Sequence, residues 1–299
     1  MARERSFCYS PPQMEIRIAK EIGYCYGVRD AVDMAIDESE KADGEKVYTF
    51  GPVIHNHHTI DMLRDGHNVH TVDSMEEIGE EGATVVIRTH GTTPAKMAAL
   101  KEAGFQVKDA TCPFVLKTHR KAREYAAEGY HIVILGHRNH PEVVGIAGQV
   151  PANHTIVDKK GDIDLVKRQL KIAALFQSTV TFDEYAWAIP LLASKCYEFK
   201  LLQTVCGVTI TRQKRTEEVA REVDLMVIIG GRNSSNTRKL VEVSERHCRT
   251  IHIEEPEEID AADLSAVRRI GISTGTSTPE FLVDRLVERL KAREPAPRA

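Results

Sequence analysis

The stretch Asp109-Ala110-Thr111-Cys112-Pro113 decides the predicted fold, because its design recurs in two other parts of the chain. Cys112 follows a short strand-like run at Phe105–Val107 and directly precedes Pro113, a preferred first residue of a helix. Residues 114–127 then carry apolar side chains at helical spacing. Cys112 is therefore predicted to lie at a helix N-terminus, where backbone N–H groups and the helix dipole favour a thiolate.

Two further cysteines repeat this placement, one in each remaining third of the chain. Cys25 precedes the helical run Val28–Ala42, and Cys206 precedes the polar helical run Thr211–Val223. Their separation excludes a zinc ribbon or a ferredoxin-type cluster loop, whose ligands come in C-x₂-C runs. The other three are interpreted as incidental or packed thiols: Cys8 in the N-terminal tail, Cys196 in a helical run and Cys248 late in another.

Length and composition restrict the class of protein. The 299 residues allow two or three domains with real cores. The formal net charge of −4 and the dispersed basic residues argue against nucleic acid as a partner. No apolar run approaches the roughly 20 residues that cross a bilayer, and no signal peptide is recognised, so we expect no membrane and a cytoplasmic location. Six cysteines in such a protein argue against a disulfide framework.

Strands and helices alternate from Ile16 onwards, which predicts an α/β fold with mainly parallel sheets. The predicted strands are Glu15–Ala19, Lys46–Phe50, Thr84–Arg88, His131–Leu135, Ile172–Phe176, Leu225–Ile229 and Arg269–Ser273. The stretch Phe182–Leu202 is predicted to be a helix interrupted near Pro190. We expect a first domain at 15–111, a second at 112–205 and a third at 206–292, with loose tails at 1–14 and 293–299.

The predicted strands end in polar clusters. These are His55, His90, His140 with Glu142, Gln177-Ser178-Thr179, Asn233–Asn236 and Ser277. In parallel α/β sheets, ligands bind at the carboxyl ends of strands, where helix N-termini favour anions. Histidine, hydroxyl and amide groups suit a compact diphosphate. The sequence has neither a Walker A lysine motif nor a G-x-G-x-x-G fingerprint, which favours a small phosphorylated metabolite over a nucleotide.

Several of these residues have a structural alternative. Ser277 begins an S-x-x-E capping box with proline at the first helical position, so it could simply cap a helix. The residues Ser234–Asn236 could likewise be cap residues. Glu142 could be a first-turn acid that stabilises the helix dipole, or a proton donor, and these two interpretations stay open at this point.

As a set, the motifs resemble those of the 4-hydroxy-3-methylbut-2-enyl diphosphate reductases. The resemblance runs from about Ile16 to Leu290, in the order of the family. The motifs that carry it are Gly23-Tyr24-Cys25-Tyr26-Gly27-Val28, Val53-Ile54-His55-Asn56, Thr89-His90-Gly91, Asp109-Ala110-Thr111-Cys112-Pro113, Gly136-His137 with His140-Pro141-Glu142-Val143, Asn233-Ser234-Ser235-Asn236 and Gly275-Thr276-Ser277.

The resemblance implies a trefoil of three similar α/β domains around a central 4Fe–4S cluster. It implies that Cys25, Cys112 and Cys206 are the cluster ligands and that Glu142 delivers protons. The diphosphate would be held by His55, His90, His140, Ser234, Ser235, Asn236 and Ser277. The family commonly has Gln-Thr-Thr where this chain has Gln177-Ser178-Thr179. Ser178 keeps the hydroxyl and is expected, with Thr179, to keep the role in the substrate site, although it loses a methyl that would restrict its rotamer.

The implied reaction is reductive removal of an allylic hydroxyl to give isopentenyl and dimethylallyl diphosphate, the last step of the methylerythritol phosphate route to isoprenoids. No flavin or nicotinamide motif is recognised, so a ferredoxin or flavodoxin is the expected electron donor. Two rival classes of protein remain. One is a non-redox iron–sulfur hydro-lyase acting on a small phosphorylated metabolite, and the other is a zinc- or phosphate-binding regulatory protein.

Overall fold

The computed structural model describes residues 14–79 and 81–293. Within them the chain divides into two compact units. One unit is Tyr24–Thr211 together with Asn233–Asn236, and the other contains the described parts of Met1–Gly23, Arg212–Arg232 and Thr237–Ala299. The predicted tails lie almost wholly outside the described residues, as does Cys8.

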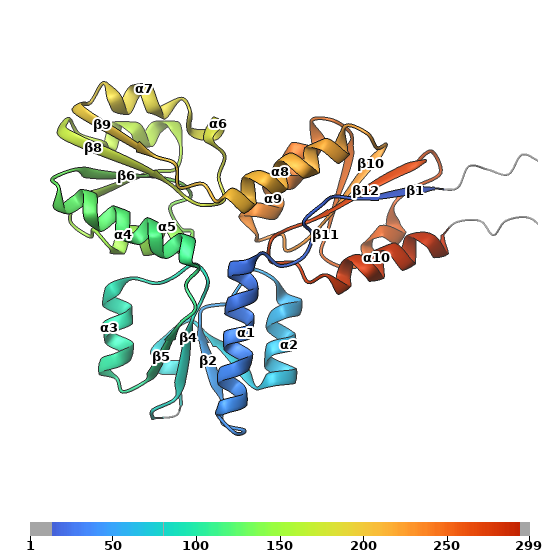
Figure 1. The fold of residues 1–299 in the computed structure, drawn as a ribbon, viewed down its shortest axis with the longest axis horizontal. Helices are drawn as coiled ribbons and strands as arrows, with labels where there is room; N and C mark the ends of the chain where they lie inside the picture. The colour runs from blue at the N-terminus through green and yellow to red at the C-terminus, as the bar shows by residue number, and fades with distance from the viewer. Residues whose placement is uncertain (1–13, 80, 294–299) are drawn as a thin grey trace, which may run out of the picture. The chain divides into compact units, whose positions relative to one another are not determined.

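Three parallel four-stranded sheets confirm the predicted α/β architecture (Figure 1). The first has the order β3-β2-β4-β5, the second β7-β6-β8-β9 and the third β1-β12-β10-β11. Their bounds are β1 Glu15–Ile18, β2 Val47–Phe50, β3 Val69–Val72, β4 Thr84–Ile87, β5 Gln106–Asp109, β6 His131–Leu135, β7 His154–Val157, β8 Gln169–Phe176, β9 Cys196–Leu202, β10 Leu225–Ile229, β11 Arg249–Ile253 and β12 Arg269–Thr274. Because every pairing is parallel, the carboxyl ends of the strands in each sheet share one edge.

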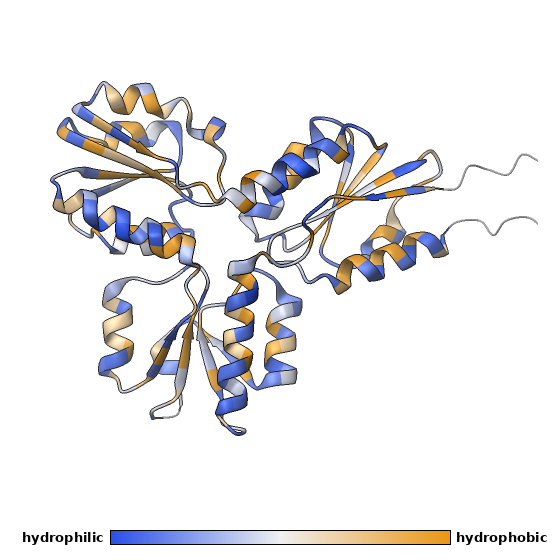
Figure 2. Ribbon diagram, in the orientation of Figure 1, coloured by the Kyte–Doolittle hydropathy of each residue, from blue (hydrophilic) through white to orange (hydrophobic). Residues whose placement is uncertain are grey.

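Helices connect the parallel strands, as crossover connections require. Their bounds are α1 Tyr26–Lys41, α2 His57–His67, α3 Pro94–Glu102, α4 Pro113–Ala127, α5 Pro141–Gly148, α6 Phe182–Tyr185, α7 Ala188–Ala193, α8 Gly207–Ala220, α9 Ser235–Glu245 and α10 Phe281–Ala292. Helices such as α1 and α10 carry both hydrophobic and hydrophilic residues along their length, as helices with one buried face do (Figure 2). No helix among the described residues is both long and apolar enough to span a membrane.

The cores lie on both faces of the sheets. In β6, Val133 and Leu135 pack into one hydrophobic cluster, whereas Ile132 and Ile134 pack into another. The strand β10 divides its residues between two clusters in the same alternating way. Successive side chains of a strand point to opposite faces, so a strand covered on both faces must be apolar throughout. This is why β6 and β10 were recognised with the correct bounds.

The first strand belongs to the third sheet rather than to the first. Residues Glu15–Ile18 pair in parallel with Arg269–Ile272 of β12, which lies near the other end of the sequence. Each sheet therefore has the same order of strands. In the third sheet, β1 from the start of the chain takes the edge position that β5 and β9 take in the other two sheets. The expected range 15–111 had assigned this strand to the first domain. Strand pairing is non-local, so the sequence pattern identified β1 but could not identify its partner. The boundaries near Cys112 and Cys206 stay predictions.

The prediction of a helix over the whole of Phe182–Leu202 is wrong. Two short helices, α6 and α7, end at Ala193, and Cys196–Leu202 forms the strand β9 at the edge of the second sheet. Cys196 therefore begins a strand, not a helical run. The edge strands β3, β7 and β11 were also missed. Edge strands are partly exposed and carry polar residues, so they lack the continuous apolar run that identifies a buried strand.

Candidate active site

The three cysteines singled out in the sequence each begin a helix. The carbonyl of Cys25 accepts the N–H of Arg29 at 2.9 Å, and that of Cys112 accepts the N–H of Leu116 at 3.0 Å. The carbonyl of Cys206 accepts the N–H of Ile210, also at 3.0 Å. These are the first intrahelical bonds of α1, α4 and α8, so all three cysteines occupy N-cap positions, as predicted.

The helix N-terminus favours the thiolate of Cys112, as expected, but burial has the larger effect on its pKa. Burial raises the pKa of this thiol, and the backbone N–H groups of Phe114 and Val115, which lower it, do not compensate. The nearby thiols of Cys25 and Cys206 raise it further. Ligation of a metal requires the thiolate, so a positively charged centre bound by the cysteines would favour this form.

The cysteines lie near one another but not tightly enough to share one metal ion. A Cβ on Gly27, in the first turn of α1, would lie only 2.6 Å from the sulfur of Cys112. The three sulfurs nevertheless do not all lie within 4.8 Å of one another. Thiolates around a single tetrahedral zinc ion, with Zn–S bonds of about 2.3 Å, would lie about 3.8 Å apart. This donor set therefore fits a larger, multi-iron centre better than a single ion.

Three histidines from three different strand ends gather in the same unit as the cysteines. His55 follows β2, His90 follows β4, and His140 is the N-cap of α5 after β6. The ring centroids lie 4.6 Å apart for His55 and His90, 5.2 Å for His90 and His140, and 5.8 Å for His55 and His140. Burial, followed by the two neighbouring imidazoles and Arg88, holds the pKa of His90 well below its usual value. His90 is therefore neutral until an anion compensates it.

Glu142, two residues after His140, forms a hydrogen-bonded pair with Ser178. Glu142 is only 1% exposed. Its carboxylate accepts the backbone N–H of Ser178 at 2.7 Å and the hydroxyl of Ser178 at 2.6 Å. Burial raises the pKa of Glu142 to about 7, although both bonds from Ser178 oppose the shift. A carboxyl with this pKa can both hold and release a proton near neutral pH.

The strand-end loops also hold two of the cysteines. The carbonyl of Thr89, beside His90, accepts the N–H of Cys112 at 3.0 Å. The carbonyl of Ser178 accepts the N–H of Cys206 at 2.9 Å. A displacement of either cysteine would therefore be transmitted to the polar side chain in the adjoining loop.

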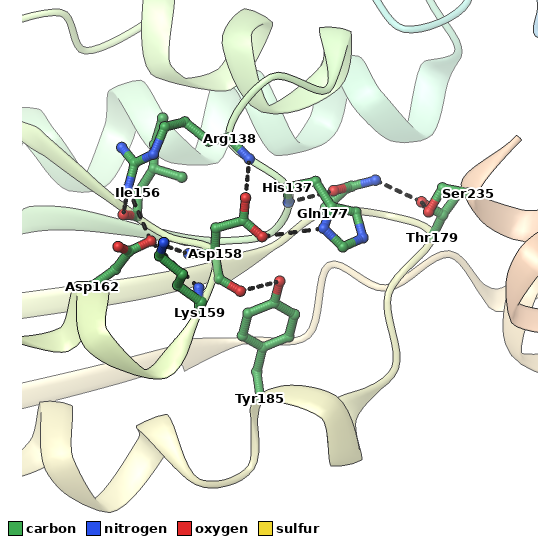
Figure 3. A network of polar contacts seen from close by, with 10 residues as sticks. All are labelled: His137, Arg138, Ile156, Asp158, Lys159, Asp162, Gln177, Thr179, Tyr185 and Ser235. Atoms are coloured by element: carbon green, nitrogen blue, oxygen red, sulfur yellow. Dashed lines mark hydrogen bonds and ion pairs between the residues drawn. The ribbon is translucent and has the colours of Figure 1, made fainter. Parts of the chain in front are cut away.

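A hydrogen-bond network links the second sheet to the start of α9 (Figure 3). The side-chain carbonyl of Gln177 accepts the N–H of His137 at 3.0 Å, and its amide donates to the hydroxyl of Thr179 at 2.8 Å. Thr179 donates to the hydroxyl of Ser235 at 3.1 Å. Thr179 thus accepts from Gln177 and donates its own hydroxyl proton to Ser235. Ser235 is therefore an acceptor in this bond, and its own hydroxyl proton can be donated to another group, for example an anion.

Asn236, next in the chain, is 2% exposed and belongs to the same unit. Neither atom of its side-chain amide has a hydrogen-bond partner among the described residues. A buried polar group without a partner costs about 1–3 kcal/mol, so it indicates a place where a ligand binds. Ser234 is also buried.

The comparisons with known proteins agree on one family. Residues 16–291 match the family model described as LytB protein. The chain belongs to the LytB family. A relative from Aquifex aeolicus (strain VF5), named 4-hydroxy-3-methylbut-2-enyl diphosphate reductase, is 38% identical over 282 residues, covering 93% of this chain and 96% of the relative. A relative of the same name from Geobacter sulfurreducens (strain ATCC 51573 / DSM 12127 / PCA) is 37% identical over 279 residues, covering 93% of this chain and 97% of the relative.

Solved structures extend the LytB likeness to three dimensions. One, described as (E)-4-hydroxy-3-methyl-but-2-enyl diphosphate reductase, the terminal enzyme of the non-mevalonate pathway, is 37% identical with a TM-score of 0.71. The match covers 94% of this chain and 100% of the chain in the solved structure. The E-1-hydroxy-2-methyl-but-2-enyl-4-diphosphate reductase from Plasmodium falciparum is 25% identical with a TM-score of 0.87, covering 95% of this chain and 90% of that chain. These reductase names do not favour the hydro-lyase alternative.

Ser277 follows β12 and belongs to the other compact unit, unlike the remaining predicted site residues of this LytB-family chain. It is buried there, and its role in diphosphate binding stays a prediction.

Arg212 of α8, which no sequence pattern singled out, is buried in that same unit. Its guanidinium donates to the carbonyls of Gly23 at 2.8 Å, Thr274 at 3.1 Å and Gly275 at 2.9 Å. Arg212 thus holds two backbone segments, one just before Cys25 and one just before Ser277. An arginine in a polar helical run gives no sequence signal for such a role.

Proposed function

We propose that this chain is a 4-hydroxy-3-methylbut-2-enyl diphosphate reductase that converts the (E)-allylic alcohol to isopentenyl and dimethylallyl diphosphate. In this reaction the substrate takes up two electrons and two protons. Its C–O bond breaks, a C–H bond forms, and the hydroxyl leaves as water. Protonation at one or the other end of the allylic system gives the two products. The observation that carries the proposal is the presence, in one compact unit, of three N-cap cysteines, three gathered histidines and the Glu142–Ser178 pair.

The cysteines Cys25, Cys112 and Cys206 would hold a 4Fe–4S cluster. The fit rests on their N-cap positions and on sulfur separations too wide for one ion. When bound, the cluster would supply the electrons and an open iron acting as Lewis acid on the leaving oxygen. The electrons would reach it from a ferredoxin or flavodoxin.

The diphosphate would be bound by the gathered histidines and by the groups around Asn236. Neutral His90 is a hydrogen-bond donor that can become a cation once the anion is present. The buried, unpartnered amide of Asn236 and the hydroxyl of Ser235 add donors at the N-terminus of α9, which itself favours an anion. The proposed set is His55, His90, His140, Ser178, Thr179, Ser234, Ser235, Asn236 and Ser277.

Glu142 would hold the proton that the substrate receives. In its ionised form it accepts the hydroxyl of Ser178, and in its protonated form it can donate to the same oxygen. Ser178 can then pass on its own proton, so the pair acts as a short relay. The burial of Glu142 limits proton exchange with bulk water, so its carboxyl group is the local source of the proton.

Electron uptake is the experiment that tests this function. Anaerobically purified protein, after iron and sulfide analysis, is mixed with reduced methyl viologen and the allylic diphosphate. We expect viologen oxidation in the ratio that a two-electron reduction requires, with both C5 diphosphates formed. Turnover of the substrate without viologen oxidation would contradict the proposal and favour the hydro-lyase class. Bound zinc with no iron would favour a regulatory protein. The cytoplasmic location stays a prediction from the sequence.

A further inference from the structure

The loops that follow β2, β6 and β10 begin in the same way in all three sheets. Each loop starts with a glycine, whose N–H donates to the last carbonyl of the neighbouring edge strand. These bonds run from Gly51 to Val72 at 2.7 Å, from Gly136 to Val157 at 3.2 Å and from Gly230 to Ile253 at 2.9 Å. The three loops can therefore be compared position by position, counting from the glycine.

A pair of acids follows the edge strand in each sheet. The first acid comes directly after the strand, and its N–H donates to the carboxylate of the second acid, four residues later. The pairs are Asp73 with Glu77 at 3.2 Å, Asp158 with Asp162 at 3.0 Å and Glu254 with Glu258 at 2.7 Å. In all three sheets, the second acid thus stabilises the tight turn after the strand.

In the second sheet, an arginine joins the acid pair to the loop (Figure 3). Arg138 is the third residue of the loop after β6. Its backbone N–H donates to the carboxylate of Asp158 at 3.0 Å, and its guanidinium donates to Asp162 at 2.9 Å. The other carboxylate oxygen of Asp158 lies 3.2 Å from Nδ1 of His137, the preceding loop residue. We call Arg138, Asp158 and Asp162 the β6 clamp.

The third sheet repeats this arrangement after β10. Arg232 is again the third residue of its loop, and the sequence around it, like that around Arg138, is Gly-x-Arg-Asn. Its backbone N–H donates to the carboxylate of Glu254 at 2.8 Å, and its guanidinium donates to Glu258 at 2.6 Å. We call Arg232, Glu254 and Glu258 the β10 clamp. Two loops are thus held by the same set of bonds.

The first sheet shows that the turn does not need the arginine. The third residue of its loop is Val53, which is buried in the hydrophobic core, and its carbonyl accepts the N–H of Thr89. The acid turn after β3 nevertheless forms. Packing of an apolar side chain therefore fixes the first loop, whereas the two clamps fix the others.

Global stability does not explain the clamps either. The side chains of Arg138 and Arg232 are 43% and 54% exposed, and exposed ion pairs contribute little to the stability of a fold. Their position in the loops is more informative. His140 lies two residues after Arg138, and Ser234 lies two residues after Arg232. Each clamp thus holds the backbone directly before a residue of the proposed diphosphate site.

We propose that the β6 clamp and the β10 clamp position His140 and Ser234 for the diphosphate, without touching it. The inference rests on the proposed diphosphate site and adds residues outside the proposed binding set. A loop that leaves its binding arrangement for part of the time lowers the apparent affinity by that fraction. The affinity for diphosphate therefore depends on the carboxylates that accept the loop N–H groups.

Substitutions of the first acid in each clamp test this dependence. Asp158→Ala and Glu254→Ala remove the acceptor of the loop N–H, whereas Asp158→Asn and Glu254→Gln keep an acceptor oxygen. Binding of inorganic diphosphate to the cluster-containing protein is measured by anaerobic calorimetry, with thermal unfolding and iron content followed in parallel. We expect the alanine variants to weaken binding about 3- to 10-fold and the amide variants to stay within about 2-fold of the parent.

Hydrogen exchange reports on the loops directly. In the alanine variants, exchange should accelerate at the amides of Arg138 and Arg232, respectively, and stay parental in the core strands β6, β8 and β10. Since a general loss of stability would accelerate exchange in these strands as well, the pattern separates positioning from a structural defect.

The arginines provide a second approach to the same clamps. Arg138→Met and Arg232→Met remove the guanidinium bonds but keep the backbone N–H, so we expect binding to weaken about 2- to 5-fold. Arg285→Met is the matched control. Arg285 forms a similarly exposed ion pair with Glu257 at 2.8 Å, in the turn after β11, and this pair holds no strand-end loop. Its loss should leave the affinity unchanged.

Parental affinity in the alanine variants would overturn the proposal, and so would equal weakening in the alanine and amide variants. If the alanine variants do not fold, the arginine series decides. Parental affinity in Arg138→Met and Arg232→Met, or the same weakening in Arg285→Met, would then overturn the role of the clamps. A parent protein that does not bind inorganic diphosphate would instead overturn the proposed diphosphate site, and the role of the clamps with it.

Discussion

At the scale of single residues, burial decides the chemistry of Glu142. Its carboxylate accepts two hydrogen bonds from Ser178, which would ordinarily keep it ionised. Loss of water outweighs both bonds and raises its pKa to about 7. Proton delivery therefore needs both features. The hydroxyl of Ser178 relays the proton, and the burial of Glu142 keeps its carboxyl group protonated near neutral pH.

Replacing Glu142 by Gln should separate proton delivery from binding. Gln keeps the shape and the hydrogen bonds but supplies no proton, so we expect turnover to fall by about 10²- to 10⁴-fold, the usual span for general acid–base groups. Diphosphate binding and iron content should stay near the parental values. The measurement is viologen-linked activity, with Glu124→Gln on the exposed surface of α4 as the control. Parental turnover in Glu142→Gln would remove this residue from the mechanism.

The same carboxyl predicts a dependence on pH. Its pKa is raised from 4.5 to about 7 in the folded protein, so the folded state binds more protons than the unfolded state between these values. The contribution of Glu142 to stability is therefore lost as pH rises from 4.5 through 7. Turnover that needs the protonated form should decline as pH rises past about 7. A parental pH profile that stays flat from 6 to 9 in the chemical step would contradict this assignment.

Binding of diphosphate should draw a proton into the protein. His90 is neutral in the free protein because burial and two neighbouring imidazoles lower its pKa. An anion nearby raises the pKa of an imidazole, so we expect proton uptake on binding and an affinity that falls as pH rises. Calorimetry of inorganic diphosphate in buffers of different ionisation enthalpy measures this uptake. His90→Ala should reduce it and weaken binding, whereas zero uptake in the parent would contradict the prediction.

At the scale of elements, three helices place one cysteine each at their N-caps. Because each helix starts from a different loop, replacement of any one cysteine should remove a ligand that the other two cannot supply. We expect Cys25→Ser, Cys112→Ser and Cys206→Ser each to lose most of the iron and the activity after anaerobic purification. Iron and sulfide analysis with absorption spectra provides the measurement.

The remaining described cysteines offer matched controls for this series. Cys196 begins the edge strand β9, and Cys248 lies in the turn after α9. Cys196→Ser and Cys248→Ser should keep parental iron content. Full iron content and activity in Cys25→Ser would refute the ligand assignment, and so would iron loss in both controls.

At the scale of the whole chain, the first strand completes the last sheet. The strand β1 pairs with β12 over four residues and covers what would otherwise be an open edge. Deletion of residues 1–18 should therefore destabilise the third sheet more than deletion of residues 1–13, because only the longer deletion removes β1. Hydrogen exchange should accelerate at the amides of β12 and stay unchanged in β6 and β8. Equal exchange at β12 in the two deletions would contradict this role for β1.

The sequence by itself determined what local rules govern. Apolar runs of four to eight residues identified the buried strands β4, β6, β8, β10 and β12, because a strand covered on both faces must be apolar throughout. The placement of each cysteine directly before a helical run identified the three N-caps. Polar residues placed after strands pointed to His55, His90 and His140, which the structure brings together, since the carboxyl ends of parallel strands share an edge.

Only the tertiary structure decided what depends on distant contacts. The pairing of β1 with β12 joins the two ends of the sequence, and the edge strand β9 depends on its neighbour β8 for recognition. The upward shift of the Cys112 pKa results from burial, which only the folded chain produces. Arg212 gained its role from carbonyls more than 60 residues distant at their nearest. Pairing, desolvation and buried hydrogen bonds are properties of the folded chain, so no local pattern in the sequence encodes them.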